Sequence, residues 1–367
     1  MARNRKSLRY LRYAVQAWFL GFCVYMGRAF YQFVMQFDPE AAYSGPPLTR
    51  PDSVDAFLPI GGFMGTKLLA ITGHIELMHP AAVMSFIAIV GMSVVARKSF
   101  CGWVCPVGTI SQYVWMVGEK IFGRNFRIPQ MGDLGLRSIK YILVFTFVGF
   151  IMIMPSYFLL LYMLDEYYMV VDVRMLNLFM DMSSLTATVL ISLVVLSVFF
   201  KNFWCRYLCP YGALLGLVGK LSPFRVVRDE SKCIHCHACT KHCPTLIEVE
   251  SKAEVTSAEC IGCMTCVSRC PKEGALEMGV KLGRNRIALK RPAIFAAAAV
   301  ATLYLVIGLA MLGGVWKSQV PREEYSRMIP KVLYPDTYGK EEVKEDRDEV
   351  YKGPSGSYDR EPSSPSK

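Results

Sequence analysis

Thirteen cysteines carry most of the chemistry available to this chain of 367 residues. Twelve of them fall into four short clusters, and only Cys23 stands alone. Disulfide frameworks belong to small secreted domains, whereas cysteines repeated at spacings of two or three residues are typical of metal ligation. The first question is therefore which metal centres these clusters hold.

Eight cysteines form two copies of the pattern C-x2-C-x2-C-x3-C-P, which start 27 residues apart. In this pattern three thiolates hold one 4Fe–4S cluster, and the fourth cysteine reaches the other cluster. Zinc also uses C-x2-C pairs, but it needs four ligands per site and does not explain why both copies close with C-P. We therefore predict two 4Fe–4S clusters with crossed ligand sets: Cys233, Cys236, Cys239 and Cys270 for the first, and Cys260, Cys263, Cys266 and Cys243 for the second.

This segment resembles bacterial two-cluster ferredoxins over roughly residues 225–280. Three histidines, His235, His237 and His242, lie between the ligands. We expect them to be solvated or hydrogen-bonded to cluster sulfurs rather than to bind iron.

The other four clustered cysteines share the form aromatic-C-x3-C-P-x-G, with Cys101 and Cys105 in one copy and Cys205 and Cys209 in the other. Each copy follows an apolar run, so the chain contains two repeated membrane hairpins. Parallel repeats pack about an axis along the membrane normal, which would bring the two cysteine pairs together. We predict a candidate third 4Fe–4S cluster there. A redox-active or copper-binding thiol pair, and cysteines kept for packing, remain as alternatives.

The elements that position these motifs are apolar helices, since 53% of the residues are hydrophobic. A hydrocarbon core about 30 Å thick needs about 17–25 helical residues. Five runs meet this requirement: 14–36, 80–96, 141–164, 184–200 and 292–316. The fold class is therefore an α-helical polytopic membrane protein, with about five transmembrane helices and an inserted α+β ferredoxin module of the bacterial 2(4Fe–4S) type.

Charge orients these spans, because Lys and Arg are retained on the cytoplasmic side. Basic residues outnumber acidic ones by five to none in residues 1–13, by seven to two in 97–140 and by fifteen to eight in 201–291, whereas the loops 37–79 and 164–183 are acidic. We predict a multi-pass protein of the cell inner membrane, with a cytoplasmic N-terminus and ferredoxin module. The net charge of +11 follows from this topology, and no basic patch interleaved with aromatics indicates nucleic acid.

Four domains follow from this organisation. They are a membrane domain over 1–224 with hairpin repeats at 14–122 and 137–221, a ferredoxin domain over 225–285, a C-terminal transmembrane helix over 286–316 and an extracytoplasmic polar tail over 317–367. The tail is rich in charge and ends in GPSGSYDREPSSPSK. Such a composition is too polar to fold alone, so we expect it to be disordered or bound to a partner.

Ionisable residues at membrane depth are functional candidates, and a quinol that gives up electrons needs a proton acceptor. The candidates for a quinone site are Arg28, Lys67, His74, Glu76 and His79. Arg28 also fits a side chain that extends to the outer interface, and each histidine also fits a satisfied interfacial group. Haem ligation by His74 and His79 is less favoured, since bis-histidine ligation normally uses separate helices.

Two C-x3-C-P motifs after membrane hairpins, followed by the two-cluster segment, resemble the NapH-type quinol dehydrogenase subunits over roughly residues 14–290. The resemblance implies an electron-transfer subunit of a respiratory complex, which relays electrons between the quinone pool and membrane or periplasmic partners such as a cytochrome or an Fe–S protein. A metal-reducing or assembly factor for a respiratory metalloenzyme is the alternative, and a redox-sensing scaffold is a third reading. Whether the chain is itself an enzyme stays open at this point.

Overall fold

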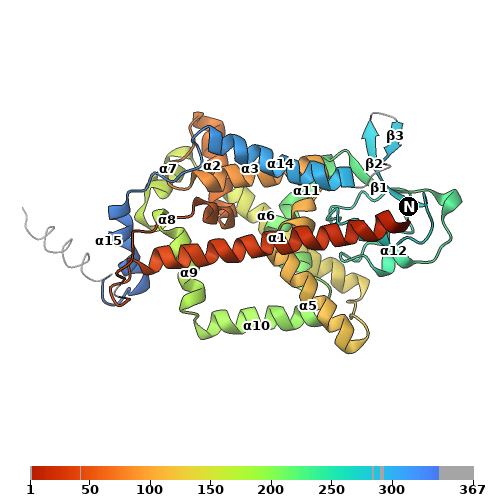
Figure 1. Ribbon diagram of the computed structural model, residues 1–367, viewed down its shortest axis with the longest axis horizontal. Helices are drawn as coiled ribbons and strands as arrows, with labels where there is room; N and C mark the ends of the chain where they lie inside the picture. Colours follow the sequence, from red (N-terminus) through yellow and green to blue (C-terminus); the bar gives the residue numbers. More distant parts are fainter. Residues whose placement is uncertain (1, 42, 283–284, 290–292, 339–367) are drawn as a thin grey trace, which may run out of the picture.

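The computed structural model describes residues 2–41, 43–282, 285–289 and 293–338, and it is mostly helical (Figure 1). The helices are α1 (Ala2–Met35), α2 (Pro59–Thr72), α3 (Pro80–Ala96), α4 (Ser99–Trp103), α5 (Pro106–Phe122), α6 (Gln130–Ile153), α7 (Ser156–Leu164), α8 (Glu166–Met169), α9 (Val171–Met180), α10 (Ser184–Phe199), α11 (Pro210–Val218), α12 (Ala238–Lys241), α13 (Thr265–Arg269), α14 (Ala293–Leu312) and α15 (Arg322–Leu333). Shorter turns are η1 (Asp52–Phe57), the π-helical η2 (Trp204–Leu208), η3 (Gly219–Leu221) and η4 (Glu230–Lys232).

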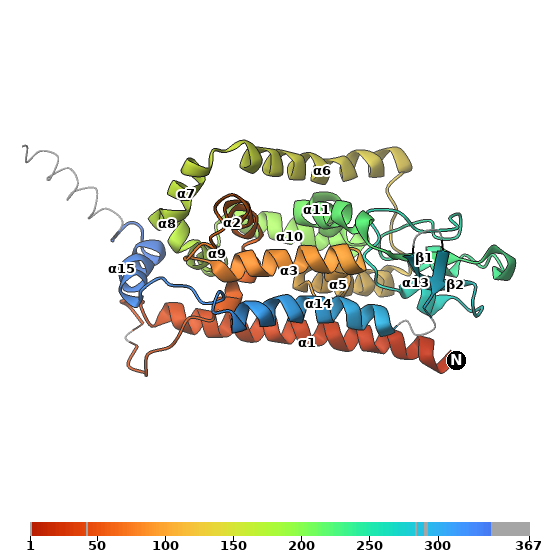
Figure 2. The same ribbon diagram turned by 90° about the horizontal axis from the view of Figure 1, so that it is seen from above.

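The long helices run in roughly the same direction, and the cysteine-rich segment lies at one end of them (Figures 1 and 2). The N-terminus lies at this end too, because Arg12 of α1 donates a hydrogen bond to Thr265 of the cysteine-rich segment at 2.9 Å. We call this the cysteine end. Helices α8, α9 and α15 lie at the opposite end, which we call the distal end.

Two helices among the described residues, α6 and α14, are long and apolar enough to cross a membrane. The number rises to three if α9 and α10, which meet at 79°, form one bent span. The five predicted spans are thus only partly shown. Helix α3 has 17 residues and α10 has 16, which is about the lower limit of the length that a span needs. Helix α1 is long but starts with a basic segment.

Large apolar side chains face outward on two of the long helices. On α6 and α10, Phe145, Phe150, Leu185 and Ile191 are each more than 60% exposed. An apolar surface this extensive is unfavourable in water and normal in contact with lipid tails. The chain is therefore a helical membrane protein.

The predicted span over 141–164 is shifted in the structure. Helix α6 begins at Gln130 and ends at Ile153, and α7 starts after Pro155. Proline lacks the backbone N–H that a continuous helix needs and disfavours helical conformation in the preceding residue. Pro155 therefore divides the predicted span in two.

The cysteine-rich segment contains a small antiparallel sheet with the strand order β1-β2-β3, formed by β1 (Phe224–Arg228), β2 (Leu276–Leu282) and β3 (Asn285–Ala288). Strand β1 precedes all eight ferredoxin-type cysteines and β2 follows them, and Val226 pairs with Met278. The sheet thus joins the two ends of the cysteine-rich segment. Its core residues Val226, Val255 and Met278 join a larger apolar core that also includes residues of α3 and α14.

The polar tail is different from the prediction. Residues 322–333 form α15, which buries Tyr325, Met328, Ile329 and Val332 against α1, η1 and α9. These four residues are spaced as one face of a helix, and a reading by composition alone misses this pattern. The ending GPSGSYDREPSSPSK lies outside the described residues.

Candidate functional site

The two C-x2-C-x2-C loops have the same backbone conformation. His235 and Gly262 precede the middle cysteine of each loop, and His237 and Met264 follow it; all four have positive φ angles, between 51° and 58°. The short helices α12 and α13 then carry the third cysteine of each loop. Non-glycine residues rarely adopt positive φ, so its recurrence at equivalent positions shows that the loops are structural repeats.

The first predicted ligand set lies together at the surface. Cys233, Cys236, Cys239 and Cys270 line one small pocket, together with Arg228, Glu250 and other residues. Cys236 is exposed and the other three are partly buried. The fourth cysteine comes from the second loop, as the crossed arrangement requires. His237 lines this pocket, and His235 and His237 both pair with Glu250.

The second predicted ligand set lies deeper. The charges of Cys243, Cys260 and Cys263 all act on Cys266, and Cys243 is buried. Burial and the neighbouring Cys263 raise the pKa of the Cys243 thiol to about 11. The backbone N–H of Ile247 donates to Cys243 Sγ at 3.4 Å, which is the kind of contact that stabilises a thiolate bound to a cluster.

The C-x3-C-P motifs meet as predicted at the cysteine end of the membrane helices. Cys101, Cys105, Cys205 and Cys209 all line one cavity, and the other three thiols all act electrostatically on Cys205. Cys105 and Cys209 cap the N-termini of α5 and α11, with proline at the first helical position. A helix N-terminus favours negative charge, so both helices stabilise anionic sulfur.

The glycines of these motifs permit close approach. A Cβ on Gly108 would lie 2.5 Å from the carbonyl oxygen of Cys101. A Cβ on Gly212 would lie 3.3 Å from Lys98 Nζ and 3.4 Å from Cys209 Sγ, and the Gly212 N–H donates to Cys209 Sγ at 3.2 Å. Each part of the pattern C-P-x-G thus has a structural reason.

All twelve cysteines fit 4Fe–4S ligation in their chemistry and grouping. No three His, Cys, Asp or Glu side chains of the described segments lie close enough together to hold a single metal ion. Two sets of four thiols instead line a pocket each, and the charges of the remaining set act on Cys266. Sets of four thiolates hold 4Fe–4S cubanes. The residues present therefore suit clusters of this kind.

Both C-x3-C-P repeats contact the backbone next to the second ferredoxin-type ligand set. Trp103 Nε1 donates to the carbonyl oxygen of Gly262 at 3.1 Å. A Cβ on Gly102 would lie 2.7 Å from the carbonyl oxygen of Ile261, so the two backbones are in close contact. From the other repeat, Arg206 donates to Thr245 O, while Asn202 donates to Pro244 O at 3.0 Å. Two pairs of contacts thus fix the loops around Cys243 and Cys260.

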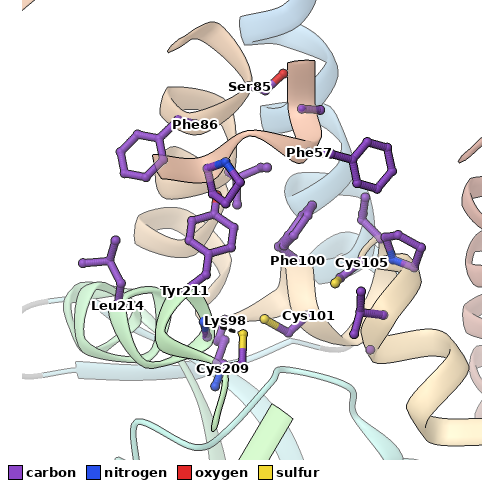
Figure 3. Close-up of a pocket in the computed structure, with 18 of the residues that line it drawn as sticks. Phe57, Ser85, Phe86, Lys98, Phe100, Cys101, Cys105, Cys209, Tyr211 and Leu214 are labelled. Carbon is purple, nitrogen blue, oxygen red and sulfur yellow. Dashed lines mark hydrogen bonds between the residues drawn. The ribbon is translucent and has the colours of Figure 1, made fainter. Parts of the chain in front are cut away.

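A cavity of about 740 Å³ extends from the four thiols between the membrane helices. Its lining is largely apolar and includes residues of α1, α2, α3 and α14. Figure 3 shows Cys101, Cys105 and Cys209 beside Lys98 at one end, and Phe57 and Ser85 at the other. The cavity thus places a polar, sulfur-rich end opposite an apolar one.

Buried charges surround the thiol end of this cavity. Lys98 and Glu259 both line it, and both are buried. Glu259 accepts hydrogen bonds from Lys140 Nζ at 2.6 Å and from Tyr141 Oη at 2.8 Å. Burial lowers the pKa of Lys98, but the charges of Cys101, Glu259, Cys209 and Cys205 outweigh it and raise this pKa above its ordinary value.

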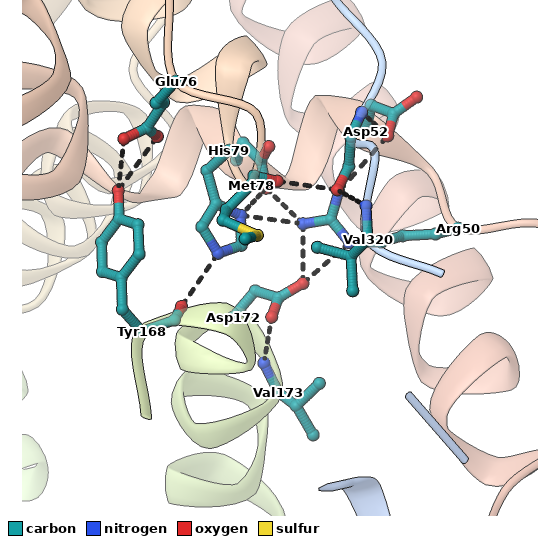
Figure 4. Close-up of polar contacts among 11 residues, drawn as sticks. Arg50, Asp52, Glu76, Met78, His79, Tyr168, Asp172, Val173 and Val320 are labelled. Atoms are coloured by element: carbon teal, nitrogen blue, oxygen red, sulfur yellow. Dashed lines mark hydrogen bonds and ion pairs between the residues drawn. The ribbon is translucent and has the colours of Figure 1, made fainter. Parts of the chain in front are cut away.

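A second buried polar group lies at the distal end (Figure 4). Arg50 pairs with Asp55 and, at 2.7 Å, with Asp172. His79 Nδ1 lies 3.0 Å from the Asp55 carboxylate, and its Nε2 donates to Tyr168 O at 3.0 Å. These contacts join residues from η1, α9 and the start of α3.

The five predicted quinone residues do not form one site, and none of them lines the cavity. Glu76 and His79 come together around Tyr168, whose hydroxyl donates to Glu76 at 3.0 Å. Lys67 caps α6, since its Nζ donates to the carbonyl oxygens of Ile151 and Met154. Arg28 and His74 are exposed.

Sequence reasoning missed Lys98 and Glu259 at the thiol end, and Asp55, Tyr168 and Asp172 at the distal end. The pair Arg97-Lys98 reads in the sequence as a membrane-edge signal, but both side chains are buried. A further sequence signal for Lys98 is its place three residues before Cys101, and the signal for Glu259 is its place directly before Cys260.

Comparison with known proteins agrees with this geometry. A family described as a 4Fe-4S binding domain matches residues 78–129 and 185–228, which contain the two C-x3-C-P motifs. A family described as a 4Fe-4S dicluster domain matches residues 225–271, which contain the eight ferredoxin-type cysteines. No solved structure shows a significant match.

Relatives with curated names point the same way. The chain is 38% identical over 322 residues to YccM of Escherichia coli (strain K12), a protein named as a candidate electron transport protein; the match covers 87% of this chain and 90% of YccM. It is 26% identical over 172 residues to the ferredoxin-type protein NapH of the same organism, covering 44% of this chain and 55% of NapH. It is 25% identical over 183 residues to the methylamine utilization ferredoxin-type protein MauN of Methylorubrum extorquens, covering 47% and 55%. The chain therefore belongs to the family of ferredoxin-type 4Fe–4S membrane proteins that includes YccM, NapH and MauN.

Proposed function

We propose that this protein is the membrane-anchored electron-transfer subunit of a respiratory oxidoreductase complex and relays electrons between the quinone pool and partner redox subunits. The observation that carries the proposal is the serial order of the thiol sets. A surface set that includes the exposed Cys236 is followed by a deeper set that includes the buried Cys243. The four C-x3-C-P thiols come next, and the apolar cavity comes last.

The two ferredoxin-type sets each hold one 4Fe–4S cluster, and the C-x3-C-P set holds a third. Such clusters supply one-electron transfer when bound. The chain's own contribution is positioning: Gly102 packs on Ile261, and Trp103 hydrogen-bonds to Gly262. These contacts hold the second ferredoxin-type ligand set beside the membrane thiols.

A quinone headgroup fits the 740 Å³ cavity beside the thiol end that the third cluster occupies, with its apolar chain toward α2. Binding sites for such molecules are mostly apolar and have a few polar groups that orient the ligand. Gln112 and Tyr211 supply those groups here. This location replaces the site predicted around Arg28, Lys67, His74, Glu76 and His79.

The topology completes the proposal. Helices α1, α3, α6, α10 and α14 make five crossings, with the cysteine end in the cytoplasm and α15 outside. The N-terminus and the cysteine-rich segment lie at one end, and α15 at the other (Figure 2). Membrane or periplasmic redox subunits, such as a cytochrome or an Fe–S protein, are the expected partners.

Quinol reduction of the purified protein tests the quinone assignment. We expect an added quinol to reduce the clusters, seen as an EPR signal. Ile60→Trp should slow this reduction at least tenfold, because Ile60 lines the cavity and its half-exposed position leaves room for an indole. Ile71→Trp is the matched control, since Ile71 lies on the same helix α2, is similarly exposed and does not line the cavity.

Two outcomes would change the proposal. If dithionite reduces every cluster and quinol reduces none, the quinone function is wrong and the metal-reducing assembly factor becomes the better account. If quinol reduces the clusters equally fast in both tryptophan variants, the quinone binds outside this cavity.

A further inference from the structure

Lys98 is held in a fixed position at the thiol end of the cavity. The preceding residue, Arg97, has a φ of 60° and donates hydrogen bonds to the carbonyl oxygens of Val255 and Ser257, at 2.8 and 2.6 Å. A Cβ on Gly219 would lie 3.0 Å from the Lys98 backbone nitrogen. The chain is therefore clamped on both sides, and the Lys98 side chain enters the cavity while that of Arg97 turns away.

Lys98 is 4% exposed, and its side chain lies near thiols from both repeats. Cys101 comes from the first C-x3-C-P motif, and Cys205 and Cys209 come from the second; the charges of all three act on Lys98. In the part of the chain that the structure describes, Lys98 Nζ has no hydrogen-bond acceptor. Figure 3 shows it beside Cys209 and close to Cys101.

The carboxylate of Glu259 is shared between Lys98 and a second lysine. Glu259 also acts on Lys98, but Lys140 Nζ lies 2.6 Å from its carboxylate in a buried ion pair. Two lysines therefore share one carboxylate, and a positive charge is left facing the thiols. A buried charge without a counter-charge is costly, so this arrangement is suited to an anionic group in the cavity.

We propose that Lys98 is the counter-charge of the third 4Fe–4S cluster and raises its reduction potential. The inference rests on the proposed third cluster. A cluster held by four thiolates is anionic and gains one further negative charge on reduction, and net charge is among the factors that set its potential. A fixed cation stabilises the reduced form more than the oxidised form. One electron then enters the cluster more readily, and no bond forms or breaks.

The test is an EPR-monitored redox titration of the purified full-length chain, combined with iron analysis. Lys98→Met removes the charge and keeps a chain of similar length. We expect its third cluster to be at least tenfold less reduced at a fixed potential, a shift of at least about 59 mV to lower potential for a one-electron couple. Lys98→Arg should stay near the wild-type potential. Lys220→Met is the control, because Lys220 is an exposed lysine at the same end.

Each result has a defined meaning. An unshifted third signal in Lys98→Met, with about twelve irons per chain, would overturn the role of Lys98 and leave the third cluster standing. About eight irons in the wild-type protein would instead refute the third cluster itself. If the third cluster fails to assemble in both Lys98→Met and Lys98→Gln but persists in Lys98→Arg, the positive charge is required for the anionic cluster, which supports the proposal. Failure in all three variants would contradict it.

Discussion

The two ends of the molecule both bury charged side chains, but they balance the charges differently. At the distal end, Arg50 faces Asp55 and Asp172, and Asp55 is also bonded to His79. Positive and negative groups of the chain itself neutralise one another there. At the cysteine end, Lys98 and Lys140 share the single carboxylate of Glu259 beside four thiols.

This difference separates a structural site from a functional one. A closed set of ion pairs holds loops together. A cation that faces thiols across a cavity is complete only when an anionic group is present. Burial of charge therefore indicates function here only where the chain does not supply the counter-charge.

The largest effect is expected from removing the distal cation. Arg50→Met leaves Asp55 and Asp172 buried without their cation, and removal of one partner of a buried ion pair costs about 3–5 kcal/mol. We expect a large fall in the thermal midpoint of the detergent-solubilised protein and unchanged cluster potentials. Arg322→Met is the matched control, because Arg322 is exposed, hydrogen-bonds to Gln36 and Leu48 and lies over the Phe37 ring, and none of these partners is a buried charge. Equal destabilisation by both variants would show that the distal group is not a special structural site.

A second effect concerns the pH dependence of stability. Burial raises the pKa of Glu76 from 4.5 to about 8. Between these values the folded protein holds a proton that the unfolded chain releases, so stability falls as the pH rises, by about 1.4 kcal/mol per pH unit, and levels off above about 8. Glu76→Gln removes this loss, because the amide oxygen can still accept from Tyr168 and carries no charge.

Thermal midpoints of both proteins between pH 5 and pH 9 check this prediction. The wild-type midpoint should fall relative to that of Glu76→Gln across this range. Asp55 and His79 are present in both proteins, so their titration cancels in the difference. Parallel curves would show that Glu76 is ionised in the folded state at neutral pH.

The sequence predicts the cysteine end well because its signals are local. The spacing of the C-x2-C-x2-C loops predicts which thiols gather, and the crossed positions of Cys243 and Cys270 follow from it. The convergence of Cys101 with Cys205 follows from the repeat. Glu259 lies apart from its partner Lys140 by more than a hundred residues, so no local pattern predicts that pair.

The distal end is less predictable for the same reason. Asp172 and Arg50 are 122 residues apart in the chain and meet only when α9 packs near η1. Composition predicts a tail that is disordered or bound to a partner, because the segment is polar overall and its composition does not reveal the apolar face of α15. Its packing depends on α1 and α9, which supply the surface that Tyr325 and Ile329 cover.

Iron content tests the central claim most directly. Three 4Fe–4S clusters predict about twelve irons per chain, and replacing Cys101 and Cys205 together by Ala should lower this to about eight with both ferredoxin-type signals intact. Cys23→Ala is the control, since Cys23 lines the same cavity but belongs to neither motif. About eight irons in the wild-type protein, with no loss in the double variant, would contradict the account.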